Sequence, residues 1–135
     1  MAIWGLGAFY SETGDVTQSF LSHGVGCIGW DNRDAPDLHR LLSRIRIGDI
    51  IYLKAHPPSQ GLIIKAVGIV INDHVHPVAN VGEACITVNW VWSGNVLVGR
   101  VRGKYNVRNN TLFEEINLVI QKRVVGLLLS EVNVQ

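Results

Sequence analysis

Short apolar runs separated by polar turns alternate along the first half of the chain. Residues 2–10 and residues 25–30 are small and apolar, and each run predicts a buried strand. Between them, Asp15 is typical of a helix N-cap, and the pair His23-Gly24 is typical of a helix end. The opening segment therefore predicts a strand, a short helix and a second strand.

The next segment contains the most regular helical pattern. Four apolar residues follow Pro36 with the i, i+3, i+4, i+7 spacing of one helix face: Leu38, Leu41, Leu42 and Ile45. Proline suits the first turn of a helix, where its missing N–H leaves no hydrogen bond unmade. Beyond a turn, apolar runs at residues 50–55 and 62–72 predict two strands, and Gly68 in the second run indicates a bulge.

An alternating run at residues 85–92 predicts a further strand. The alternation puts Trp90 and Trp92 on one face, where they would form a continuous aromatic platform. That platform suits core packing, and it also suits stacking on a base or on a partner protein. A loop is expected before this strand, at residues 73–82, and a turn after it, at residues 93–95.

The remaining chain predicts three more elements. Residues 96–101 and 111–116 are expected to be short strands. Residues 118–129 predict a C-terminal helix, although their β-branched side chains also suit a strand. The element order predicts an α+β protein with one domain over residues 1–135, built as a small curled or closed mixed β-barrel with two or three flanking helices.

Composition fits a folded domain. Of the 135 residues, 47% are hydrophobic and 17% are charged, and the formal net charge is +1. No apolar run reaches the ~20 residues that a membrane helix needs, and the first residues lack a signal-peptide pattern, so we expect a cytoplasmic protein without membrane contact. Cys27 and Cys85 lie in strand-like runs, and in that compartment we expect buried free thiols rather than a disulfide.

Two glycine–tryptophan segments form the candidate ligand site. Trp4 and Trp30 stand at or near strand ends beside glycines, where the backbone can approach a flat ring closely. Asp31 and Asn32 follow Trp30 and can accept hydrogen bonds from the exocyclic amines of a base. We predict a ligand site formed by these four residues and Gly5. The alternative is that both tryptophans belong to the core, with their indole N–H groups bound to backbone carbonyls.

A basic segment is the candidate contact for phosphates. Residues 84–113 contain four basic residues and no acidic one: Arg100, Arg102, Lys104 and Arg108. Arg100 and Arg102 alternate with Val101, so a strand would place both on one face. They suit contacts to a nucleic-acid backbone, and they also suit the solvated face of a strand.

Other chemistry finds little support in the sequence. His74 and His76 have the spacing of two metal ligands on a strand face, and His56 or Asp73 could supply a third. The surroundings are loop-like and no carboxylate or cysteine pairs with them by pattern, so a surface loop is the better interpretation. The sequence contains no nucleophile elbow, no dinucleotide-binding glycine pattern and no phosphate-binding loop. We therefore predict no cofactor and no metal, and we name no catalytic residue.

The order of three segments resembles the PUA-like superfamily, which includes the EVE, ASCH and YTH domains. The segments are Ile3-Trp4-Gly5, residues 26–30 and residues 45–52. The strand-like residues 61–70 continue the third segment and resemble the next barrel strand. The resemblance implies a pseudo-barrel that binds nucleic acid. EVE and YTH members hold a modified base, flipped out of its strand, in an aromatic-lined pocket.

We therefore expect a non-enzymatic module that binds nucleic acid or a nucleotide and reads a modified or flipped base. The near-neutral charge and the apolar C-terminal segment also suit a small-nucleotide-binding or protein-interaction accessory protein of a mobile-element or defence system, with a homodimer as a possible assembly. The resemblance to ASCH hydrolases implies a third function, based on a Lys–Thr–Glu-type site inside the barrel. Lys54, Lys65 and Glu83 are the residues available for it.

Overall fold

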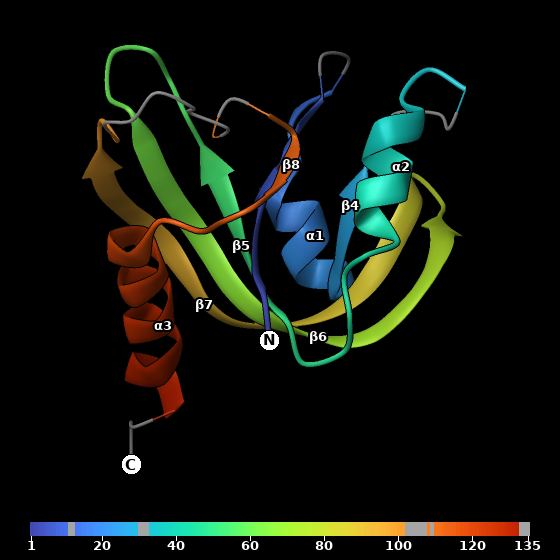
Figure 1. Cartoon of the computed structure of the whole chain (residues 1–135). Coiled ribbons are helices and arrows are strands. Elements are labelled where there is room, and N and C mark those ends of the chain that lie inside the picture. The colour runs from blue at the N-terminus through green and yellow to red at the C-terminus, as the bar shows by residue number, and fades with distance from the viewer. Residues whose placement is uncertain (11–12, 30–32, 102–107, 109, 133–135) are drawn as a thin grey trace.

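The structure is a computed structural model that describes residues 1–10, 13–29, 33–101, 108 and 110–132. Within these ranges, the chain forms a six-stranded mixed sheet that curls into a half-barrel, with three helices packed around it (Figure 1). This confirms the α+β class and the curled sheet expected from the sequence. The elements are β1 (Ile3–Gly7), β2 (Phe9–Tyr10), β3 (Gly14–Asp15), α1 (Thr17–His23), β4 (Val25–Ile28), α2 (Pro36–Leu42), β5 (Ile50–Ala55), β6 (Leu62–Val78), β7 (Gly82–Gly99), β8 (Leu112–Glu114) and α3 (Leu118–Val132).

The strand order of the sheet is β4-β7-β6-β5-β1-β8. Strand β1 runs parallel to β5, and the other neighbouring pairs are antiparallel. Strands β2 and β3 form a separate two-stranded ribbon, in which Phe9 pairs with Asp15. This ribbon connects the end of β1 to the start of α1, and it borders the hollows described below.

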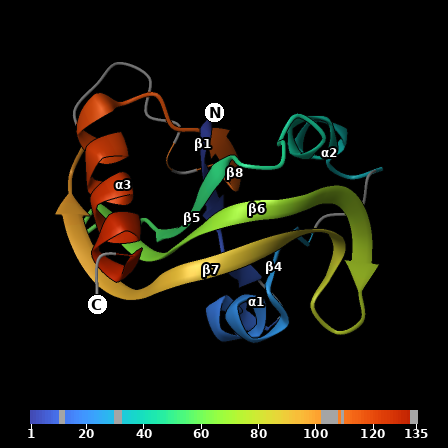
Figure 2. The same cartoon turned by 90° about the horizontal axis from the view of Figure 1, so that it is seen from below.

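The two faces of the sheet carry two hydrophobic cores. Successive residues of β5 point to opposite faces, so Ile51 belongs to the first core and Tyr52 to the second. Helices α1 and α2 cover the first core, in which Phe20 and Leu42 are buried. Helix α3 covers the second core, in which Val124 is buried. Figure 2 shows α3 at one end of the long β6–β7 ribbon, with α1 and α2 toward its other end.

Several elements match the sequence prediction closely. The strand predicted at residues 50–55 is β5, and the C-terminal helix is α3. Helix α2 begins at Pro36 as expected. Helix α1 ends at Gly24, which takes the left-handed conformation (φ 64°) that favours glycine. The predicted bulge at Gly68 is confirmed, because the β6–β7 register shifts between Val67 and Gly68.

The loop expected at residues 73–82 is a turn over residues 79–81 alone, and the turn expected at residues 93–95 is wrong. Strand β6 continues to Val78, and β7 runs unbroken from Gly82 to Gly99. Most side chains of residues 71–80 are exposed or half-buried, so backbone pairing rather than burial keeps this segment extended. A polar strand of this kind carries the composition of a loop.

The platform expected from Trp90 and Trp92 is also wrong. Val67 pairs with Trp92, whereas Gly68 pairs with Trp90, so β7 has one extra residue at this point. A shift by one residue moves the following side chains to the opposite face. Trp90 accordingly packs against the first core and Trp92 against the second.

Cys27 and Cys85 are joined by a disulfide, which corrects the expectation of free thiols. The two residues are direct partners in the antiparallel pair of β4 and β7. The bond ties the edge strand β4 to the sheet across a sequence separation of 58 residues. The spacing of the cysteines in the sequence contains no information on this register, which depends on how the two strands align.

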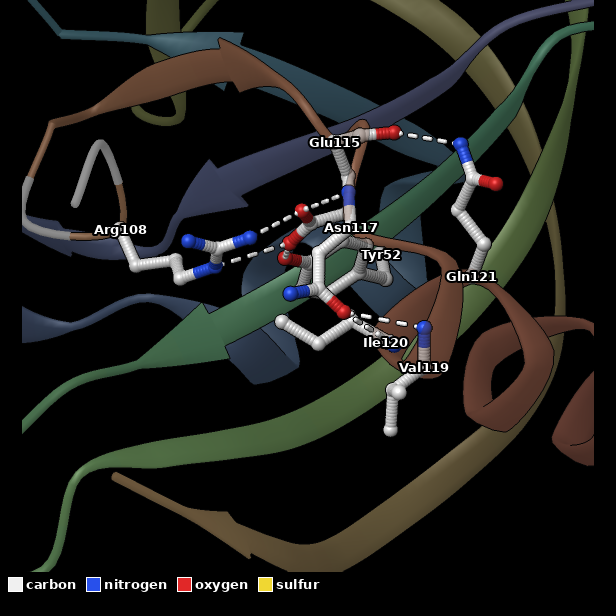
Figure 3. Close-up of polar contacts among 7 residues, drawn as sticks. All are labelled: Tyr52, Arg108, Glu115, Asn117, Val119, Ile120 and Gln121. Atoms are coloured by element: carbon white, nitrogen blue, oxygen red, sulfur yellow. Dashed lines mark hydrogen bonds and ion pairs between the residues drawn. The ribbon is translucent and has the colours of Figure 1, made fainter. Parts of the chain in front are cut away.

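A buried carboxylate connects the second core to the start of α3 (Figure 3). Glu115 is 0% exposed and forms an ion pair with Arg108. Its Oε1 accepts hydrogen bonds from the Tyr52 hydroxyl (2.7 Å) and from Arg108 Nε (3.1 Å). Its Oε2 accepts one from the backbone N–H of Asn117 (3.1 Å). Burial and the neighbouring Glu115 carboxylate both raise the pKa of Tyr52 well above its usual range.

The same cluster sets the first turn of α3. Asn117 Oδ1 accepts hydrogen bonds from the backbone N–H groups of Val119 (2.9 Å) and Ile120 (3.2 Å). The side-chain amide of Gln121 donates to the backbone carbonyl of Glu115 (2.8 Å). The position of the helix therefore depends on the buried carboxylate beside it.

We predict that Glu115→Ala lowers the free energy of unfolding by about 3–5 kcal/mol, because it leaves the Arg108 guanidinium buried without its counter-ion. Urea denaturation followed by circular dichroism measures this change. Glu114→Ala is the matched control, since Glu114 is the neighbouring residue and is exposed. Equal stability of the two variants, within about 0.5 kcal/mol, would contradict the prediction.

Candidate functional site

Trp4 lies in the first core rather than in an open pocket. Its side chain is 2% exposed, and its indole Nε1–H donates to Asp49 Oδ2 (3.0 Å). Asp49 also accepts hydrogen bonds from the backbone N–H groups of Ala2 and Arg46 (both 3.0 Å). Burial alone would raise the pKa of Asp49, but these three donors lower it below its ordinary value. Trp4 therefore anchors β1 to the turn before β5, and the core interpretation replaces its expected role as a ligand contact.

Packing in the core also explains the glycine at position 5. A Cβ at this position would overlap the ring of Phe113, which packs over the Gly5 backbone from β8. The close approach that the sequence suggested is therefore real, but its partner is a core phenylalanine and not a flat ligand. Gly5 is removed from the candidate ligand site on this ground.

Of the other residues expected at the ligand site or at a nucleic-acid backbone, the structure describes Arg100 and Arg108. Trp30, Asp31, Asn32, Arg102 and Lys104 lie outside the described residues. Arg108 was expected at a nucleic-acid backbone, and this is corrected, because the residue is 6% exposed and paired with Glu115. Arg100 is exposed, and its Nη2 donates to the backbone carbonyl of Pro58 (3.1 Å).

Pro58 forms part of a hollow with a volume of about 620 Å³, which we call the Lys54 hollow. It lies where the ends of β1 and β5 meet the β2–β3 ribbon and the first residue of α1. Its volume is within the ~300–1,000 Å³ typical of small-molecule sites. Its polar lining residues are Asp15, Thr17, Lys54, His56, Lys65 and Thr111.

Lys54 is the chemically distinctive residue of this hollow. Burial lowers the pKa of its ammonium to about 8. The Nζ atom lies 5.8 Å from the centroid of the Phe113 ring, an arrangement that favours the charged form only weakly. The lysine therefore carries a positive charge at neutral pH and loses it within the mildly alkaline range.

An ion pair forms one wall of the hollow. Lys65 Nζ lies 2.5 Å from Asp15 Oδ2. The other oxygen of Asp15 accepts hydrogen bonds from the backbone N–H (2.9 Å) and the hydroxyl (2.6 Å) of Thr17. Burial opposes the charge of Asp15, but Lys65 and Thr17 together lower its pKa. The residue expected to cap α1 thus supports the start of the helix and also fixes Lys65 beside the hollow.

Two further residues make the hollow suitable for a planar ligand. Phe9 lines it and is 72% exposed, so its ring is accessible to a ligand in the hollow. His56 also lines it, and its Nε2 atom is buried with no hydrogen-bond partner among the described residues. A buried polar atom without a partner is costly, and a ligand in the hollow would offer one.

A second hollow, on the Tyr10 side of the β2–β3 ribbon, is a weaker candidate for an anion. Its volume is about 480 Å³, and its charged lining residues are Asp15 and Glu83. The Tyr10 hydroxyl is buried without a partner in the described part of the chain, and burial raises its pKa to about 12. Among the described residues its lining contains no lysine or arginine to balance these two carboxylates, which disfavours phosphate.

Comparison with known proteins leaves the family open: the chain matches no protein-family model and no curated protein. None of the helices in the described part of the chain combines the length and apolar composition that a membrane-spanning helix needs. Groups of three or more potential metal ligands are likewise absent from the described residues. His74 and His76 stack on each other in β6, with ring centroids 6.3 Å apart.

The Lys54 hollow was not predicted as the site. The sequence identified Lys54 and Lys65 only as residues available to a hydrolase. It considered His56 only as a third metal ligand, and it assigned no role to Phe9. These residues lie on separate strands and loops, and none belongs to a recognisable motif. A lysine near the end of an apolar strand was the one available signal, and it equally fits a solvated sheet edge.

We predict that Gly5→Ala lowers the free energy of unfolding by about 1–3 kcal/mol, because the new methyl group displaces the Phe113 ring. Gly126→Ala is the control, since a Cβ at this position in α3 meets nothing within 4 Å. That substitution should raise the stability by up to ~1 kcal/mol through helix propensity. Thermal unfolding of both variants measures the contrast, and an unchanged Gly5→Ala protein would contradict the packing role.

Proposed function

We propose that this chain is a nucleotide- or nucleic-acid-binding module of PUA-like architecture, and that the Lys54 hollow holds a base together with its phosphate. The observation that carries the proposal is the lining of this hollow, which combines two lysines with an exposed phenylalanine. Cations bind phosphate, and an aromatic ring stacks on any base.

The surroundings of the hollow support an anionic ligand. Arg100 donates a hydrogen bond to the backbone carbonyl of Pro58, which lines the hollow, so one residue of the predicted basic segment contacts this lining. His56 Nε2 is available to a polar atom of the base or the sugar. The net charge of +1 supplies little long-range attraction for an anion, so the proposal relies on the cations that line the hollow.

The proposal is tested by binding of fluorescein-labelled, short single-stranded DNA and RNA, modified and unmodified, with mononucleotides as competitors. Phe9→Ala should weaken binding by about 1–3 kcal/mol, the typical contribution of one stacked base. Ile71→Ala is the control, because Ile71 is also exposed but lies on β6 away from the hollow. Absence of binding by the unmodified protein to every oligonucleotide and nucleotide would exclude this function.

Binding of a phosphate group should also weaken as the pH rises through about 8, where Lys54 loses its charge. The ligand for this test is an adenine or cytosine nucleotide, because guanine, uracil and thymine lose a ring proton in the alkaline range. A phosphate monoester is mostly doubly ionised at pH 7, so the charge of this ligand changes little above it. Lys54→Arg should remove the pH dependence, because arginine stays protonated. Titrations at several pH values between 7 and 9.5 check this, and an unchanged pH profile in Lys54→Arg would exclude Lys54 as the origin.

Hydrolysis of an acylated nucleoside is a second candidate function. It is favoured by the neutral form of Lys54, which is accessible near pH 8, and by the Thr17 hydroxyl in the same hollow. Glu83 lines the hollow beside Tyr10 instead, so Asp15 is the carboxylate nearest to this chemistry. Turnover of acylated nucleosides that disappears in Lys54→Ala would support this function. Binding without turnover would support the non-enzymatic module.

A further inference from the structure

A third hollow, which we call the Asn95 hollow, adjoins the Lys54 hollow. Its volume is about 450 Å³. Asp15, Thr17 and Lys65 line both hollows. A side chain that lines two hollows stands at their boundary, so the two spaces meet across the Lys65–Asp15 ion pair.

The boundary is suited to a phosphate. Both carboxylate oxygens of Asp15 are engaged, one by Thr17 and the other by Lys65. The Lys65 side chain is 22% exposed, so its ammonium is positioned by Asp15 and still reaches the solvent-filled space on either side. An ammonium has three donors, and one of them is used by Asp15 in the described structure.

The Asn95 hollow differs from its neighbour in chemistry. Apart from the shared ion pair and Thr17, its polar side chains are those of Gln18, Ser93 and Asn95, and all of them are neutral. Leu21 adds an apolar surface. A Cβ at Gly94 would lie 2.9 Å from Cζ2 of Trp92, so the backbone here rests directly on an indole. Amide groups can both donate to and accept from the edge of a base, and hydroxyl groups can bind a base or a ribose.

We propose that the Lys54 and Asn95 hollows bind two successive nucleotides of one single strand, with the phosphodiester between them at Lys65. This inference rests on the proposed function and adds to it the length and the strandedness of the ligand. A duplex would keep both bases paired, whereas each hollow needs an unpaired base. The Lys54 hollow supplies the cationic contacts, and the Asn95 hollow supplies the neutral hydrogen bonds.

The first test compares a mononucleotide, the corresponding dinucleotide and a short single-stranded oligomer, as DNA and as RNA, by isothermal titration calorimetry. The dinucleotide should bind about tenfold or more tightly than the mononucleotide, which corresponds to one additional base contact. A hairpin duplex of the same bases should bind more weakly than the single strand. A dinucleotide that binds no more tightly than the mononucleotide would overturn the inference.

The second test assigns the additional contact to the Asn95 hollow. Asn95→Ala should weaken binding of the dinucleotide several-fold and leave binding of the mononucleotide unchanged. Asn89→Ala is the matched control, because Asn89 is an exposed asparagine of the same strand that does not line the hollow. Equal weakening of both ligands in Asn95→Ala would overturn the inference, as would no weakening of either.

The two proposals fail in different ways. If mononucleotides bind and the dinucleotide binds with no higher affinity, the Lys54 hollow remains the proposed site and only the second subsite is excluded. Failure of every nucleotide and oligomer to bind removes the proposed function and the inference together.

Discussion

The geometry of the Lys54 hollow depends on the contacts of one buried carboxylate, that of Glu115. Glu115 has no exposed surface, so its charge must be matched inside the protein, and Arg108, Tyr52 and a backbone N–H match it. These contacts hold β8 against β1, where Glu115 N–H also donates to the carbonyl of Ile3 (2.7 Å). They place Phe113 over Gly5, and they leave Thr111 at the edge of the Lys54 hollow.

The candidate site is built at the margin of this arrangement. Strands β1 and β5 run parallel and end side by side, which brings Gly7 next to Lys54. The β2–β3 ribbon then turns away from the sheet, because its two strands pair only with each other. The space between the ribbon and the sheet is therefore not filled by core side chains, and charged and aromatic groups line it instead.

Asp15 shows how one residue can serve both folding and binding. As a helix-start residue it accepts two hydrogen bonds from Thr17, and as an anion it holds Lys65 in place. A lysine fixed in this way loses less conformational entropy when it binds a phosphate than one that moves freely. The same ion pair lies between the Lys54 hollow and the Asn95 hollow. The first hollow is lined by a further lysine and an aromatic ring, and the second by neutral amide and hydroxyl groups.

The sequence by itself determined the α+β class and several elements, because each follows from local periodicity or backbone preference. These elements are the helix that begins at Pro36, the C-terminal helix, the strand at residues 50–55 and the bulge at Gly68. Tertiary structure decided the rest. The β7 register separated Trp90 from Trp92 and joined Cys27 to Cys85, and burial converted Trp4, Gly5 and Arg108 from expected ligand contacts into structural residues. Phe9, Lys54 and His56 came together in one hollow only through the packing of the ribbon beside the sheet. Such contacts join residues that are distant in the chain, and a local pattern contains no information about which distant residues meet.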